Sequence, residues 1–164
     1  MNHRLAFVAL IALSQFFPNP SWSQQKALKD TIVGAWLISS LIDVYEDGRK
    51  NNPWGAGMKG MIVFDSSGWF SQMIIGEKQE SMKSSDPRRP DALIVAYYGT
   101  YTVNEADKTV SMKLVRATNS SRDGSEQKLT IEASTGDVLV FVGSPRKDQQ
   151  GTFSPHFELK RGNR

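Results

Sequence analysis

The sequence predicts an all-β domain, an eight-stranded antiparallel up-and-down β-barrel, and three observations lead to this fold class. Short runs rich in β-branched and aromatic residues follow one another from residue 32 onward, separated by turn signals at fairly regular intervals. Apolar and polar side chains alternate within these runs. The runs number about eight, the strand count at which an antiparallel sheet closes around room for one small ligand. A flattened β-sandwich is the alternative architecture.

The expected strands are separated by polar or glycine-containing turns. In the run TVSMKLV, apolar side chains occupy every second position from Val110 onward, so one face of this strand is dry and the other wet. Residues 65–68, Asp-Ser-Ser-Gly, are expected to form a tight hairpin turn. The polar stretch 76–90 is expected to form a long loop, and residues 91–96 one helical turn. The eight expected strands span residues 32–44, 58–64, 69–75, 98–103, 109–116, 127–133, 138–142 and 153–160.

The N-terminal residues have the three-part pattern of a secretory signal peptide. Arg4 provides a basic start, residues 5–17 are apolar, and residues 21–23, Ser-Trp-Ser, place small side chains at the −3 and −1 positions of a cleavage site. The apolar run is shorter than the roughly 20 residues that cross a bilayer, although an uncleaved anchor is the alternative. We therefore expect cleavage after Ser23, a secreted or periplasmic mature protein and no stable membrane anchor. The expected organisation is a signal peptide, a polar lead-in and a barrel domain: residues 1–23, 24–31 and 32–164.

The composition excludes several kinds of chemistry and partner. The chain has no cysteine, which excludes disulfides, thiol nucleophiles and zinc–thiolate sites. Its formal net charge is only +3, and its basic doublets are scattered with no aromatic residues interleaved, so we expect no nucleic-acid partner. The sequence does not indicate the oligomeric state.

The expected first strand carries a glycine and a tryptophan separated by one residue, Gly34 and Trp36. This placement resembles the G-x-W signature of the lipocalins and related calycin barrels, in which the tryptophan plugs the closed end and an arginine of the last strand packs across its ring. The resemblance implies that Arg161, in phase with Phe157 and Leu159, is this arginine. Glycine would let the chain pass close under the barrel floor, and the guanidinium would add a cation–π contact of about 0.5–2 kcal/mol. The alternative is an ordinary core tryptophan with an unrelated terminal arginine.

More of the chain resembles one branch in particular, the lipocalin-like domain of many bacterial and fungal proteins of unknown role. The matching residues are Gly34, Trp36 and Ser39; Asp47-Gly48; Pro53 and Gly55; Gly60 and Met61; Asp65 and Gly68; and Tyr98-Gly99-Thr100-Tyr101 with Val103. The order of these short motifs carries the resemblance. Where that branch often has a histidine, this chain has Ser111 and Met112, and a later arginine is replaced by Lys128. Chemistry that depends on that histidine is therefore not expected here.

Motifs for catalysis, nucleotides or metals are not supported by their context. Residues 55–60, GAGMKG, match G-x-G-x-x-G but follow a loop and precede a strand, whereas a dinucleotide site needs a strand before and a helix after. The mature chain has a single histidine, His156, and no G-x-S-x-G elbow, so neither a multi-histidine metal site nor a presented serine nucleophile is expected. We assign no catalytic residue, no metal and no cofactor.

Aromatic and methionine side chains on separate expected strands favour an apolar cavity that adapts to a ligand. Trp54, in the Pro/Gly loop, is a candidate cap of the open mouth. The alternative is that these side chains only fill the core. The candidate ligand-binding residues are Phe64, Trp69, Met73, Tyr98, Tyr101 and Met112.

The leading hypothesis is an exported barrel that binds a small apolar or amphipathic molecule non-covalently, with Tyr98 or Tyr101 fixing its orientation. A second hypothesis is a small enzyme, such as a cyclase, isomerase or hydratase, which uses the barrel as a dry reaction chamber. Its acid or base would come from Tyr98, Tyr101, His156 or Asp43. A third is a filled barrel that acts as an interaction module, with a packed interior and an exposed apolar patch.

Overall fold

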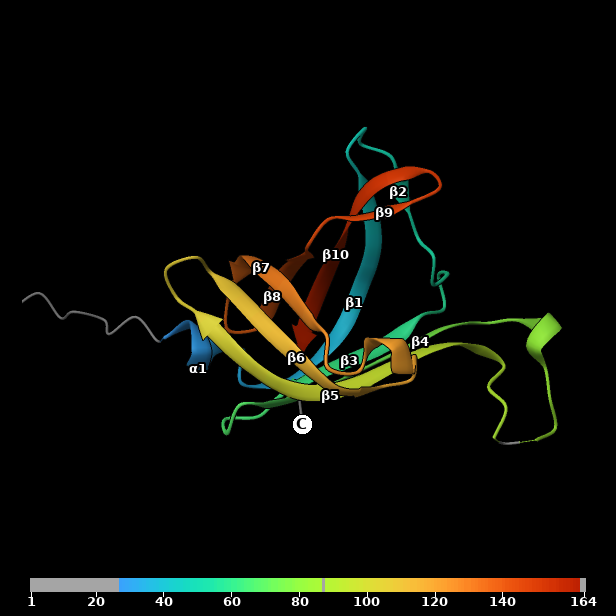
Figure 1. Cartoon of the computed structure of the whole chain (residues 1–164), viewed down its shortest axis with the longest axis horizontal. Coiled ribbons are helices and arrows are strands. Elements are labelled where there is room, and N and C mark those ends of the chain that lie inside the picture. The colour runs from blue at the N-terminus through green and yellow to red at the C-terminus, as the bar shows by residue number, and fades with distance from the viewer. Residues whose placement is uncertain (1–26, 87, 163–164) are drawn as a thin grey trace, which may run out of the picture.

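The chain folds into one continuous antiparallel sheet that closes on itself. A computed structural model describes residues 27–86 and 88–162, so the expected signal peptide lies outside the described residues. Each barrel strand pairs with its neighbour in chain order, and the first strand also pairs with the last (Figure 1). This closure confirms the predicted fold class over the sandwich. The barrel strands are β1 (Gly34–Tyr45), β3 (Lys59–Phe64), β4 (Trp69–Lys78), β5 (Ala92–Asn104), β6 (Thr109–Ala117), β7 (Glu126–Ser134), β8 (Val138–Gly143) and β10 (Gly151–Arg161).

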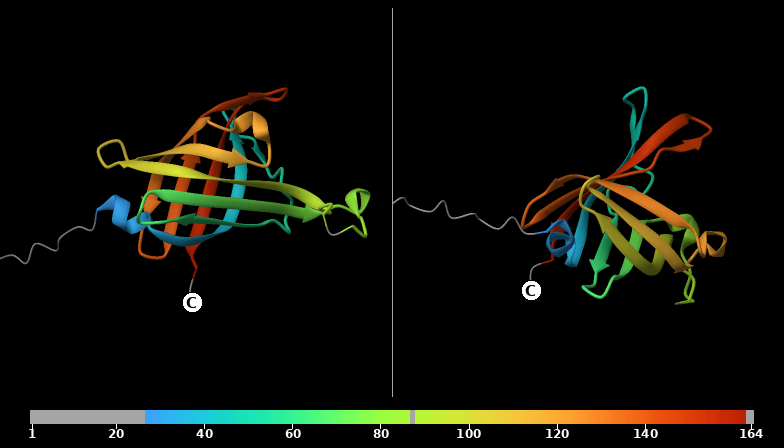
Figure 2. Two further views of the ribbon diagram at one scale, coloured as in Figure 1. Left: turned by 60° about the horizontal axis from the view of Figure 1, so that its bottom comes forward. Right: turned by 60° about the vertical axis from the view of Figure 1, so that its left-hand side comes forward.

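Two very short strands extend the barrel at one end. β2 (Lys50–Asn51) pairs with β1, and β9 (Arg146–Asp148) pairs with β10, so each forms a hairpin arm. Both arms project beyond the barrel from the same end (Figure 2). This end is the open one, because the opposite end is covered by a helix. The remaining short elements are the 3₁₀ helices η1 (Glu80–Met82) and η2 (Ser120–Arg122).

Three sequence expectations about local structure are wrong. Residues 91–96 do not form a helical turn, because Ile94 and Val95 suit a strand and pair with β4. β4 in turn runs on to Lys78, into the stretch expected to be a loop. Ile32 ends the short helix α1 (Leu28–Ile32) instead of starting the first strand.

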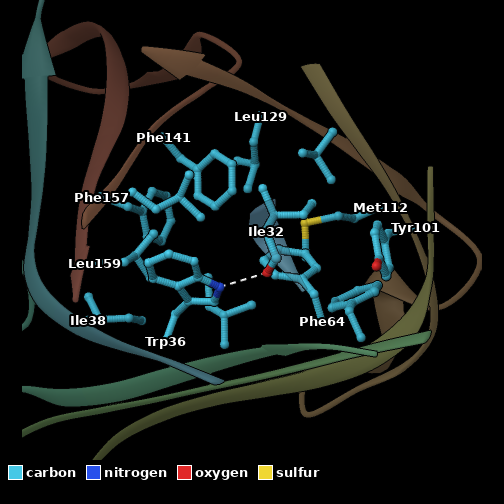
Figure 3. Packing of buried hydrophobic residues seen from close by; sticks show 14 of the residues in the cluster. Ile32, Trp36, Ile38, Phe64, Tyr101, Met112, Leu129, Phe141, Phe157 and Leu159 are labelled. Carbon is cyan, nitrogen blue, oxygen red and sulfur yellow. Dashed lines mark hydrogen bonds between the residues drawn. The ribbon is translucent and has the colours of Figure 1, made fainter. Parts of the chain in front are cut away.

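Helix α1 covers the closed end of the barrel. The backbone N–H groups of Leu28 and Lys29 donate to the two carboxylate oxygens of Glu105, at 3.0 and 2.9 Å. These bonds satisfy donors that a helix N-terminus leaves free. Ile32, at the other end of α1, is completely buried, and its carbonyl accepts a 2.7 Å hydrogen bond from the indole N–H of Trp36 (Figure 3). The helix is therefore fixed to the barrel at both of its ends.

The barrel floor joins the beginning and the end of the described chain. Trp36 is completely buried, and the guanidinium carbon of Arg161 lies 4.2 Å from the centre of the indole ring. The same guanidinium donates to the carbonyls of Thr31, Val33 and Gly136, at 2.8, 3.1 and 2.6 Å. The structure thus has the tryptophan–arginine contact that the resemblance implied.

Gly34 makes this floor sterically possible. Its φ is +131°, a backbone conformation that side-chain-bearing residues rarely adopt. A Cβ at this position would lie 2.8 Å from Nη1 of Arg161. Glycine is therefore required twice here, by the backbone conformation and by the close approach of the arginine.

The half of the barrel above the floor is filled by side chains. Phe64 packs edge-on against Tyr101 and Phe141, with ring centres 5.0 and 6.1 Å apart. Met112 is completely buried beside them (Figure 3). At protein packing densities, such a cluster leaves no room for a ligand. Inside the described part of the barrel, a cavity lies toward the open end.

Candidate ligand site at the open end

A β-bulge in β1 decides which side chains of that strand face the open end. Trp36 and Ile38 point inward, and the pairing with β10 then shifts by one residue between Ile38 and Ser40. A bulge adds one residue and so reverses the alternation after it. From Leu41 onward the odd-numbered residues point inward, which brings Asp43 into the mouth of the barrel.

A polar side chain with no partner lies inside the barrel at the level where the packed half ends. Gln72 follows the inward-facing Phe70 on β4 and is only 2% exposed. Among the residues that the structure describes, neither its amide nitrogen nor its amide oxygen has a hydrogen-bond partner. Burying an amide without partners costs about 1–3 kcal/mol, and such groups are rare in native proteins. Gln72 therefore needs an explanation other than packing.

A cavity lies beside Gln72 at the open end, and we call it the mouth cavity. Its volume is about 160 Å³, close to the roughly 150 Å³ of an engineered cavity that holds benzene in another protein. Most of its walls are apolar or aromatic, whereas its polar groups come from β1, β4, β5, η2 and β9. It is lined by Leu41, Asp43, Pro53, Trp54, Gln72, Ile74, Val95, Tyr97, Arg122, Arg146, Phe153, Pro155 and Phe157.

Asp43 is the carboxylate in this wall. Its partial burial raises its pKa above the ordinary value of 3.8, and the negative charge of Asp148 acts in the same direction. The positive charge of Arg146 opposes both effects. The mouth cavity therefore contains a carboxylate whose ionised form is disfavoured relative to water.

Tyr97 lies across from Gln72 in the β4–β5 pairing and carries the second buried polar group of the wall. Burial raises the pKa of its hydroxyl, and the Gln127 amide and the charges of Arg122 and Arg146 act against that rise. The hydroxyl accepts a 3.0 Å hydrogen bond from Nε2 of Gln127. The guanidinium carbon of Arg122 lies 5.0 Å from the centre of the Tyr97 ring. Tyr97 is thus close to both positively charged side chains of the mouth, Arg122 and Arg146.

The predicted ligand-binding residues divide between the packed half and the outer surface. Phe64, Tyr101 and Met112 are buried in the packed half, whereas Trp69, Met73 and Tyr98 are 48%, 42% and 47% exposed. The six residues therefore do not line one common cavity, and their role in ligand binding stays a prediction. Tyr98 is three residues from Tyr101, and residues an odd number apart on a strand face opposite sides.

The run 69–75 misleads for a related reason. Trp69 and Met73 occupy one face of β4, and Phe70 and Ile74 occupy the other. Because large apolar side chains appear on both faces, alternation alone does not identify the inner one. The cross-strand pair Phe64–Phe70 places the second set inside.

The residues that sequence reasoning missed at the mouth are Gln72, Tyr97, Arg122 and Arg146. Tyr97 is four residues from Tyr101 on the same strand, so the sequence already indicated that both face the interior. Arg122 comes from η2 and Arg146 from the β9 arm, and neither segment has a periodicity that predicts the direction of its side chains. Trp54, the expected mouth cap, lines the mouth cavity, but its role as a cap stays a prediction.

The enzyme hypothesis retains one of its four candidates. Asp43 lines the mouth cavity, whereas Tyr98 is outside the barrel and His156 is not in the cavity wall. The hydroxyl of Tyr101 donates to the carbonyl of Asp65 at 2.8 Å and is thereby occupied.

Among the described residues, no group of three or more histidine, aspartate or glutamate side chains could hold a metal ion.

An apolar row crosses the outer face of the sheet. Leu37 pairs with Met61, and Met61 pairs with Met73 on the next strand. All three are at least 36% exposed. The interaction-module hypothesis expected such a patch together with a packed interior, and it stays a prediction.

In the described part of the chain, no helix has the length and hydropathy to span a membrane.

Comparisons with known proteins show similarity to other barrels. No family model matches the sequence, and neither does any curated protein. Among solved structures, the chain is similar to a lipocalin-like protein from Bacteroides uniformis, at 14% identity over 80% of this chain and 99% of that one, with a TM-score of 0.45. A redesigned β-barrel aligns at 16% identity over 84% and 96% of the two chains, with a TM-score of 0.44. A de novo designed fluorescence-activating β-barrel aligns at 14% identity over 83% and 98%, with a TM-score of 0.43. The barrel architecture itself rests on the closed strand pairing, and membership of the lipocalin-like family stays a prediction.

Proposed function

We propose that this barrel binds a small amphipathic molecule non-covalently in the mouth cavity. The observation that carries the proposal is the buried, unpartnered amide of Gln72 beside a cavity of about 160 Å³. A ligand with a hydrogen-bond donor and acceptor at one edge would satisfy both amide atoms and recover the cost of burying them. The expected export of the mature chain is part of the proposal and stays a prediction.

The size of the cavity limits the ligand. Because side chains fill the closed half, the bound part of the ligand is about one six-membered ring with small substituents. Ligands of this size gain at most about 1.5 kcal/mol per non-hydrogen atom and usually much less, so affinities in the micromolar to millimolar range are expected. The apolar walls supply most of this energy through burial of the ring, at about 25 cal/mol per Å².

Nuclear magnetic resonance titration of the ¹⁵N-labelled protein tests the proposal directly. The probes are phenol, benzamide and benzoate, which share a ring and differ in their polar edge. At least one of them should shift the side-chain signals of Gln72 and the indole signal of Trp54 in a saturable way. Substituting Gln72→Leu should weaken that binding about tenfold, because a ligand polar group then loses its partner.

The matched control is Gln79→Leu, which makes the same chemical change at an exposed position outside the cavity wall. It should leave the affinity unchanged within about twofold. Absence of saturable shifts at the mouth for all three probes would refute the proposal. Equal weakening by both substitutions would also contradict it.

A further inference from the structure

Two arginines connect the mouth cavity to a groove on the outside of the barrel. Arg122 and Arg146 line the mouth cavity, and both also line a neighbouring groove of about 570 Å³. The rest of the groove consists of residues 125–129, 144 and 145, on and beside β7 and β9. A molecule that fills the mouth cavity therefore meets two guanidinium groups at the point where it leaves the barrel.

Both guanidinium groups keep donors for a ligand. Arg122 is half-buried and makes one side-chain hydrogen bond, to the neutral Oε1 of Gln127 at 2.8 Å. Arg146 is exposed, and within the described residues neither arginine forms a salt bridge. A guanidinium has five N–H donors in a planar fork that matches a carboxylate. Most of these donors remain for an anion.

The acidic groups nearby do not neutralise this pair. Asp43 is the carboxylate lining the mouth cavity; Asp148 accepts a 2.7 Å hydrogen bond from the hydroxyl of Tyr45 and keeps its charge, but it lines neither the cavity nor the groove. Glu126 lines the groove, as does Lys128, which offsets its charge. The cavity and the groove are together lined by three cationic side chains, Arg122, Arg146 and Lys128, and by two carboxylates, Asp43 and Glu126, so their junction keeps a positive balance.

The hydroxyl of Tyr97 adds a neutral donor at the same place. The Tyr97 hydroxyl accepts a hydrogen bond from Nε2 of Gln127 at 3.0 Å, and it donates toward Oε1 of the same amide at 3.5 Å. A separation of 3.5 Å is too long for a good O–H···O bond. The hydroxyl proton of Tyr97 is therefore available to an acceptor inside the cavity.

We propose that the ligand is a small ring carboxylate with a hydroxyl or amide group at its opposite edge. Its carboxylate lies between Arg122 and Arg146 beside the hydroxyl of Tyr97, its ring fills the mouth cavity, and its second polar group pairs with the amide of Gln72. This inference rests on the proposed function and adds a preference for an anion. Substituents beside the carboxylate extend into the outer groove.

The test compares 4-hydroxybenzoate with 4-hydroxybenzamide, which have the same size and the same hydroxyl but differ in charge. Isothermal titration calorimetry of the wild-type protein should give about tenfold tighter binding of the carboxylate, because hydrogen bonds to charged groups are stronger than neutral ones. Substituting Arg146→Gln should remove most of this preference and leave the affinity for the amide unchanged within about twofold. Raising the salt concentration should weaken the binding of 4-hydroxybenzoate and leave the binding of 4-hydroxybenzamide unchanged.

Arg89→Gln is the matched control, because it removes the same charge from an exposed arginine outside the groove and cavity. It should keep the full preference for the carboxylate. If both compounds bind the mouth equally and Arg146→Gln changes neither, the anion preference is refuted while the proposed function stands. If neither compound binds, both proposals fail together.

Discussion

The closed end and the open end of this barrel treat buried polar groups in opposite ways. At the closed end, the indole N–H of Trp36 and three donors of Arg161 are paired with backbone carbonyls. At the open end, Gln72 is only 2% exposed, and its amide has no partner among the described residues. The first arrangement stabilises the fold by itself. The second arrangement lowers the stability of the fold unless another molecule pairs with the amide, and for this reason we proposed a ligand there.

Removing the floor tryptophan should have the largest effect. Substituting Trp36→Ala should lower the free energy of unfolding by about 3–5 kcal/mol, because a fully buried side chain leaves a cavity under helix α1. Urea denaturation followed by circular dichroism measures this loss. Trp69→Ala is the control: Trp69 is 48% exposed on the outer face, and its loss should cost about 0.5 kcal/mol or less. Similar losses for both variants would contradict the described floor.

Replacing the unpartnered amide should have a smaller effect of the opposite sign. Substituting Gln72→Leu should raise the free energy of unfolding by about 1 kcal/mol in the absence of ligand, because an apolar side chain of similar size removes an unpaired buried group. The same denaturation experiment measures the gain, and Gln79→Leu should show no comparable change. Destabilisation by Gln72→Leu would mean that the amide already has partners in the free protein.

The smallest effect concerns the pH dependence of stability at the mouth. Burial raises the pKa of Asp43, so the folded state binds its proton more tightly than the unfolded state does. The protonated Asp43 side chain stabilises the folded state below the ordinary pKa of 3.8. This contribution is lost as pH rises through the higher pKa that Asp43 has in the folded state. Asp43→Asn should therefore gain stability relative to the wild type as pH rises to neutral. Solvent screening of the partly exposed carboxylate keeps this gain small.

Asp47→Asn provides the matched control for this titration. The side-chain hydrogen bond from Arg49 lowers the pKa of Asp47, and that carboxylate therefore stabilises the folded state above pH 3.8. The Asp47→Asn variant should lose stability relative to the wild type over the same rise in pH. Parallel curves for the two variants would show that the mouth does not disfavour a charged Asp43.

The barrel could be predicted from the sequence because each strand and each turn has its own local sequence pattern, and these patterns recur along the chain. Alternation within runs such as 109–116 and the turn at residues 65–68 identify strands independently of their neighbours. The position of Arg161 in phase with Leu159 placed it on the inner face, where the structure has it above Trp36. The short helix, the end of β4 and the start of β5 were misassigned, because they depend on packing against distant strands.

The mouth could not be predicted in the same way because its geometry depends on irregularities. The bulge at Ser39 reverses the parity of β1 and has no clear sequence signal. Arg122 and Arg146 reach the cavity from a 3₁₀ turn and a hairpin arm, where no period applies. Because residues an even number apart on a strand share a face, Tyr97 and not Tyr98 is expected to face the interior together with Tyr101. Tyr97 could thus be identified from the sequence, whereas the meeting of seven separate segments at the mouth cavity could not.

The seam between β1 and β10 has a consequence for how the chain acquires its structure. Trp36 pairs with Arg161, so β1 finds one of its two neighbours only after β10 has been synthesised. Until then its free edge is exposed, and contacts across such sequence distances form slowly. Loss of the last strand would therefore leave an open sheet that is prone to aggregation in place of a shortened barrel.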